Sequence, residues 1–81
     1  MDHYIATFHT HLSALRTSRT LTAKGFSANM MPVPRKVSSS CGTCVSYHAT
    51  GPMVECMDED AESIFIKEGD GYRMVHTFEE A

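Results

Sequence analysis

Long apolar runs are missing from this 81-residue sequence: none approaches the roughly 20 residues that a membrane-spanning helix needs. The first residues also lack a basic segment followed by an apolar one, so we expect no signal peptide and a cytoplasmic location. Positive charge is scarce, with seven Lys and Arg against ten Asp and Glu and a formal net charge of −3. Because nucleic-acid-binding domains usually carry a basic footprint, we expect neither a nucleic-acid nor a membrane partner.

Familiar enzyme motifs are absent as well. The sequence contains no phosphate-binding loop, no His-Glu-x-x-His pair and no nucleophile elbow, and we expect no cofactor. A chain of this length forms a single domain over residues 1–81 and buries only about two thirds of its unfolded surface, so it can hardly build a deep substrate cavity. Any chemistry must then lie on a rim or a loop, which favours a relay carrier over a turnover enzyme.

The pattern of apolar residues predicts both strands and helices. Residues 3–9 are rich in β-branched and aromatic side chains, which is typical of a strand, while Thr10 suits a helix N-cap and Gly25 a helix end. The predicted elements, in chain order, are strand 3–9, helix 10–24, strand 26–33, strand 43–48, helix 58–68 and strand 72–78. This order predicts an α+β fold, a two-layer ferredoxin-like βαββαβ sandwich with one sheet and two helices on one face.

The most informative segment joins the second and third predicted strands and reads Pro32-Val33-Pro34-Arg35-Lys36-Val37-Ser38-Ser39-Ser40-Cys41-Gly42. A thiolate is the reactive form of cysteine, and positive charge nearby lowers a thiol pKa. We therefore predict that Cys41 is the reactive residue and that Arg35 stabilises its anionic sulfur. A Ser/Gly-rich turn can hold an anion with its N–H and O–H groups, which makes Ser39, Ser40 and Gly42 candidate binding residues. The same composition is also typical of a tight turn whose thiol has no role.

This segment resembles one in a family of small selenium/sulfur carrier-like proteins. The strand Tyr4-Ile5-Ala6-Thr7-Phe8 and a following helix that contains Ala14-Leu15 are similar to that family too. The resemblance runs over roughly residues 4–78, and the eleven ordered positions from Pro32 to Gly42 are its specific part.

The resemblance implies a function in sulfur or selenium metabolism. Cys41 would accept a persulfide or selenide and relay it to a partner protein, and the residues that shape the loop would be Pro34, Arg35, Ser40 and Gly42. The implied partners are a sulfur or selenium donor protein, for which a cysteine desulfurase is a candidate, and an acceptor protein.

A second cysteine leaves other functions open, because the family pattern typically has one cysteine after the serines. Cys44 stands at Cys-x-x-Cys spacing from Cys41, so the two could form a redox disulfide, with Cys44 as a second catalytic thiol. A zinc site is the next alternative, with four potential ligands, namely Cys41, Cys44, His48 and Cys56. The third is a partner-binding adaptor without chemistry. Three cysteines are an odd number, which does not favour a disulfide framework.

The remaining polar residues carry weaker predictions. His9 and His11 flank the first strand–helix junction, and we expect them to face the cysteine loop if the first two strands lie close together. Cys56 alone is best explained as a small buried apolar residue. The acidic residues around the second predicted helix are expected to form its solvated start: Glu55, Asp58, Glu59, Asp60 and Glu62.

Overall fold

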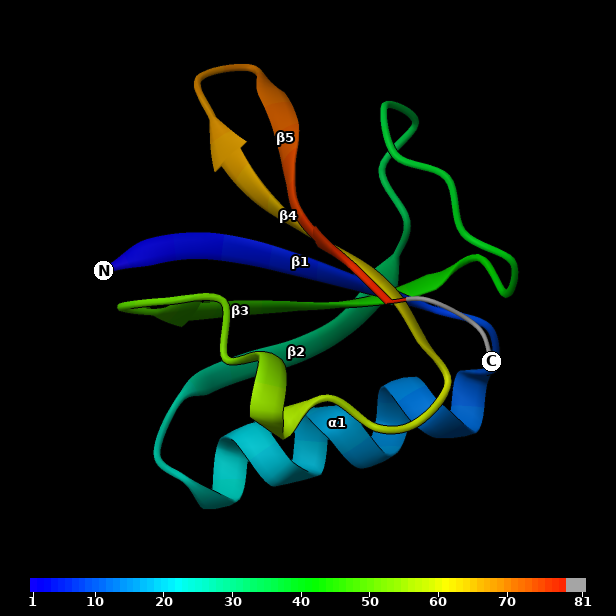
Figure 1. The fold of residues 1–81 in the computed structure, drawn as a ribbon, viewed down its shortest axis with the longest axis vertical. Helices are drawn as coiled ribbons and strands as arrows, with labels where there is room; N and C mark the ends of the chain where they lie inside the picture. Colours follow the sequence, from blue (N-terminus) through cyan, green and yellow to red (C-terminus); the bar gives the residue numbers. More distant parts are fainter. Residues whose placement is uncertain (79–81) are drawn as a thin grey trace.

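The computed structural model describes residues 1–78 of the chain. Its elements are β1 (Asp2–Phe8), α1 (His11–Ala23), β2 (Ser27–Pro32), β3 (Thr43–Ala49), the 3-10 turn η1 (Val54–Cys56), β4 (Ala61–Glu68) and β5 (Gly71–Thr77). The strands form one sheet in the order β2-β3-β1-β4-β5, and every neighbouring pair is antiparallel. Strands β1 and β2 therefore run parallel with β3 between them, and α1 connects them across one face of the sheet (Figure 1).

The predicted ferredoxin-like sandwich is wrong, because the described residues contain one α-helix and not two. The second predicted helix, residues 58–68, is mostly strand β4. Ala61, Ile64 and Phe65 fit a helical spacing, but the run Ile64-Phe65-Ile66 is β-branched and aromatic throughout, which is typical of a strand inside a sheet. β4 pairs with β1 on one side and with β5 on the other, so the backbone hydrogen bonds that a helix would form are made between strands.

Helix α1 begins after Thr10 and ends before Gly25, as predicted from the sequence. The Thr10 hydroxyl accepts a hydrogen bond from the Ser13 N–H at 3.2 Å, which satisfies one of the free N–H groups at the start of the helix. At the other end Gly25 adopts a φ of +92°, a left-handed conformation that stops the helix and turns the chain toward β2. No helix in residues 1–78 is long and apolar enough to cross a membrane.

The core lies between α1 and the face of the sheet that α1 covers. Side chains alternate along each strand, so every second residue of a strand points toward the helix. The buried side chains of this core are Tyr4, Ala6, Phe8, Ala14, Leu21, Val45, Tyr47, Ala49, Cys56, Ala61 and Ile64. Burial of this apolar surface is the main source of stability in a domain of this size.

The opposite face of the sheet bears the intervening residues, which are smaller and more polar. Ile5, Thr7, Cys44 and Ser63 are buried there. The loop between β2 and β3 and the β4–β5 hairpin both project on this side, away from α1 (Figure 1). Lys36 connects them, because its ammonium group donates a hydrogen bond to the Asp70 carbonyl at 2.7 Å. The cysteine loop therefore stands over the face that α1 leaves uncovered.

Candidate functional site

Residues 33–42 form a closed loop between β2 and β3. The Val33 N–H donates to the Gly42 carbonyl at 3.1 Å and closes the base of the loop next to the paired residues Pro32 and Thr43. Gly42 has a φ of +73°, which is the left-handed conformation that a side chain disfavours. Farther out, the Val37 N–H donates to the Pro34 carbonyl at 3.0 Å, and the Val37 side chain is buried. The loop thus has a fixed base and a packed middle.

Cys41 is the accessible cysteine of the chain. Its side chain is half-buried, and its thiol donates to the Thr43 carbonyl at 3.5 Å with the Ser39 hydroxyl 4.0 Å from the sulfur. Both of these contacts are local, made with residues two positions away from Cys41 on either side.

The two serines predicted to bind an anion donate to protein groups in this conformation. The Ser39 hydroxyl donates to the Phe8 carbonyl at 3.0 Å, and the Ser40 hydroxyl donates to the Glu62 carboxylate at 2.6 Å. The Ser40 N–H donates to the other oxygen of the same carboxylate at 3.1 Å. Both serines therefore anchor the loop to the sheet, directly before Cys41.

Arg35 and Pro34 lie at the outer turn of the loop. Arg35 is exposed, and within residues 1–78 no hydrogen bond or ion pair connects it to another residue. Pro34 contributes the carbonyl that accepts from Val37. Arg35 stands six residues before Cys41 in the sequence, and a turn lies between them. The structure shows no contact between the Arg35 guanidinium and the Cys41 thiol.

Cys44 is on β3 and is fully buried on the sheet face opposite α1. Its thiol lies 3.8 Å from the Pro32 carbonyl, to which it donates. Burial, and secondarily the proximity of Cys41, raises the pKa of the Cys44 thiol to about 11. A buried thiol with a raised pKa is a poor nucleophile at neutral pH. All three cysteines are free in the structure.

The residues of the zinc alternative do not gather at one place. Cys44 and His48 lie on the same strand four positions apart, which is about 13 Å at the usual rise per strand residue. Cys56 belongs to the core on the α1 side of the sheet, while exposed His48 stacks on His3 with ring centroids 4.5 Å apart. In the part of the chain that the structure describes, no group of three or more His, Cys, Asp or Glu side chains could hold a metal ion.

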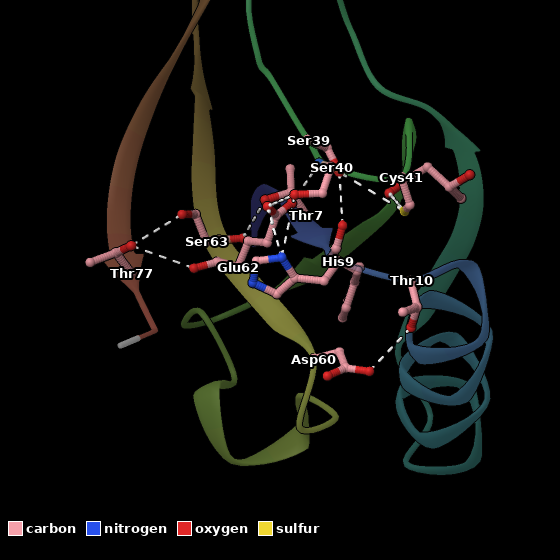
Figure 2. A network of polar contacts seen from close by, with 12 residues as sticks. Thr7, His9, Thr10, Ser39, Ser40, Cys41, Asp60, Glu62, Ser63 and Thr77 are labelled. Carbon is pink, nitrogen blue, oxygen red and sulfur yellow. Dashed lines mark hydrogen bonds and ion pairs between the residues drawn. The ribbon is translucent and has the colours of Figure 1, made fainter. Parts of the chain in front are cut away.

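A polar network joins the loop to the start of β4, and Figure 2 shows it from close by. The His9 Nδ1 lies 3.3 Å from the Ser40 hydroxyl and 3.3 Å from the Glu62 carboxylate. Burial alone would raise the pKa of the Glu62 carboxyl, but the hydrogen bonds from Ser40, together with His9, lower it below its ordinary value. The carboxylate is therefore ionised and fully engaged at neutral pH.

We expected His9 and His11 to face the cysteine loop if the first two strands lay close together, but β3 separates β1 from β2. His9 nevertheless contacts the loop, whereas His11 contacts the first residue of β3. His9 meets Ser40, and the His11 Nδ1 lies 3.3 Å from the Thr43 hydroxyl. Glu62 was not predicted, because its position within an acidic stretch indicated a solvated helix start. The one local signal was its place two residues before the apolar run Ile64-Phe65-Ile66, which is typical of a strand.

A pocket of about 260 Å³ opens beside the loop. It is lined by His11, Met30, Met31, Pro32, Gly42 and Thr43, so it adjoins the residues that follow Cys41. The pocket lies along β2, which is an edge strand of the sheet.

The fold and the site define a class of protein: a small α+β domain that presents one accessible thiol on an anchored loop. The family model described as putative Se/S carrier protein-like matches residues 3–76. The chain belongs to this family, and the match includes the whole cysteine loop. No curated protein and no solved structure matches the chain.

Proposed function

We propose that this chain is a cytoplasmic carrier that accepts sulfur or selenium on Cys41 and passes it to another protein. The observation that carries the proposal is the position of Cys41, the accessible cysteine, on an anchored loop within a member of the Se/S carrier family. Cys44 and Cys56 are buried, so neither can meet a donor in this conformation.

The transfer step needs no cofactor. The Cys41 thiolate attacks the terminal sulfur of a persulfide on the donor protein; the donor's S–S bond breaks as the new S–S bond forms. The donor leaves as a thiolate and Cys41 becomes a persulfide, so atoms and electrons balance without an added oxidant. A donor perselenide transfers its terminal selenium by the same displacement.

The donor and the acceptor are proteins that reach the loop from outside. A cysteine desulfurase fits the role of sulfur donor, because it holds a persulfide on a cysteine of its own. Gly42 and the Ser39-Ser40 pair shape the loop for the incoming sulfur, and Pro34 stiffens its outer turn. Arg35 is exposed on that turn and available to an anionic group of the partner.

Redox chemistry with Cys44 is less well supported. A resolving thiol must reach the loaded cysteine as a thiolate, whereas Cys44 is buried, donates to a backbone carbonyl and has a raised pKa. The carrier reaction therefore uses Cys41 alone.

The test is intact mass on protein purified anaerobically, before and after incubation with a cysteine desulfurase and cysteine. We expect a gain of one sulfur atom that a reductant removes, that is lost in Cys41→Ser and that persists in the matched control Cys44→Ser. A wild-type chain that gains no sulfur, or a Cys41→Ser variant that gains as much as wild type, would contradict the proposal.

A further inference from the structure

Glu62 occupies an irregular position in the sheet. Thr7 of β1 pairs with Ser63, but the next residue, Phe8, pairs with Ala61, so Glu62 is an extra residue between two consecutive pairs. This is a β-bulge, a device that re-aims a side chain and is frequent beside functional sites. Here the bulge leaves the Glu62 carboxylate mostly buried, with 19% of its side chain exposed, and directed toward the cysteine loop (Figure 2).

The carboxylate binds Ser40 of the loop with both of its oxygens. Oε1 accepts from the Ser40 N–H at 3.1 Å, and Oε2 accepts from the Ser40 hydroxyl at 2.6 Å. Hydrogen bonds to an ionised acceptor are shorter and stronger than neutral ones, and a two-point contact also fixes orientation. Ser40 is exposed, so this contact and not apolar packing holds it in place.

The neighbouring serine is also anchored beside the bulge. The Phe8 carbonyl, on the β1 side of the irregularity, accepts from the Ser39 hydroxyl at 3.0 Å. Ser39 and Ser40 are thus tied to β1 and β4 respectively, and Cys41 is the next residue in the chain. The direction in which Cys41 leaves this double anchor is set by the sheet.

We propose that Glu62 is the positioning residue of the Cys41 loop: its carboxylate holds Ser40 and so fixes the thiol where a donor can meet it. This inference rests on the proposed carrier function and adds a residue to it. Glu62 does not touch the sulfur in the structure and acts through Ser40.

A proton relay among the same residues is excluded by their geometry. In a Ser-His-acid relay the two imidazole nitrogens bridge the serine and the acid, whereas here the same His9 nitrogen, Nδ1, approaches both Ser40 and Glu62. Ser40 moreover donates directly to the carboxylate. Within residues 1–78, the titratable groups at this place include Glu62 itself, His9 directly after β1, and Asp60, whose carboxylate accepts from Thr10.

The first measurement follows the Ser40 amide of the full chain by NMR. In wild type its chemical shift should follow the titration of Glu62, with a midpoint below the ordinary glutamate value. In Glu62→Gln that titration should vanish, and the Ser40 amide should exchange with solvent about tenfold faster, the factor expected for one lost charge-assisted hydrogen bond. The matched control is Glu59→Gln, which removes an exposed carboxylate three residues away and should change neither quantity.

The second measurement is the rate at which Cys41 accepts sulfur from a persulfide-loaded cysteine desulfurase. Glu62→Gln should slow loading about tenfold, and Glu59→Gln should load at the wild-type rate. Ser40→Ala keeps the N–H contact and loses the hydroxyl contact, so its loading rate should lie between those of Glu62→Gln and Glu59→Gln. Unchanged NMR signals from α1 and β3 establish that each variant is folded.

The outcomes separate this inference from the carrier function. If wild type loads and Glu62→Gln loads at the same rate, the positioning role is overturned while the carrier function stands. If the Ser40 amide neither titrates nor exchanges faster in Glu62→Gln, the contact itself is overturned. A wild-type chain that gains no sulfur overturns the carrier function and the role of Glu62 in transfer, and the amide exchange still decides whether Glu62 holds the loop.

Discussion

Cys44 should resist alkylation in the folded protein much more strongly than in the unfolded chain. Its pKa of about 11, against an ordinary value of 9.0, leaves a thiolate fraction at pH 8 of about one in a thousand when folded and about one in ten when unfolded. Because only the thiolate reacts, folding should slow its alkylation about a hundredfold. Complete burial adds a steric barrier, so this factor is a lower bound.

A pulse of iodoacetamide at pH 8, followed by digestion and quantitative mass spectrometry, measures the rate at each cysteine. The same pulse in concentrated urea gives the unfolded reference. Cys41 should be the main labelled site in the folded chain, and Cys56, buried in the core, serves as the internal control for a protected thiol. If Cys44 reacts in the folded protein within a few-fold of its rate in urea, the burial and the raised pKa assigned to it are wrong.

Three further predictions concern stability. Folding raises the pKa of Cys44, so the contribution of this thiol to the free energy of unfolding is fully present below pH 9 and is lost as the pH rises toward 11. Urea titrations should show the free energy of unfolding falling by up to about 2.7 kcal/mol over that range. A Cys44→Ala variant whose stability falls as steeply would contradict this. Gly42→Ala should lower the free energy of unfolding by about 1 to 2 kcal/mol, because φ at Gly42 is +73° although the space around it is open. The control Gly51→Ala, at a position without positive φ, should lower it by less than about 0.5 kcal/mol. Equal losses in urea unfolding would refute the backbone explanation. Leu21→Ala should cost about 2 to 5 kcal/mol by the same assay, since Leu21 is fully buried against the sheet, and a loss below about 1 kcal/mol would place it outside the core.

The first half of the fold could be predicted from the sequence because its signals are local. A β-branched segment, the Thr10 cap and the Gly25 stop lie within a few residues of the elements they define, and β1 and α1 follow them closely. Strand β4 could not be assigned in this way. Ile64-Phe65-Ile66 lies inside the sheet, where apolar residues occupy both faces, and such a run has no alternation to separate it from a helix.

The candidate site, like the fold, could be predicted from the sequence only where its signals are local. Cys41 could be proposed as the reactive residue from its own segment, because the prolines, serines and Gly42 lie close to it in sequence. The contact between Ser40 and Glu62 joins residues 22 positions apart and depends on a bulge between β1 and β4, which no local pattern encodes. The prediction that Arg35 stabilises the sulfur relied on nearness in sequence, and the turn at Pro34 to Val37 intervenes.

The difference in exposure among the three cysteines also limits how many sulfur atoms of one chain can react with another molecule. With Cys44 and Cys56 enclosed, each folded chain has one sulfur that the surroundings can reach. Under the proposed carrier function, each chain would therefore hold its sulfur or selenium on Cys41 alone and would not pass it to a second cysteine of the same molecule. Exposure to air should therefore yield covalent pairs of chains joined through Cys41, with no longer polymers and no internal bridge.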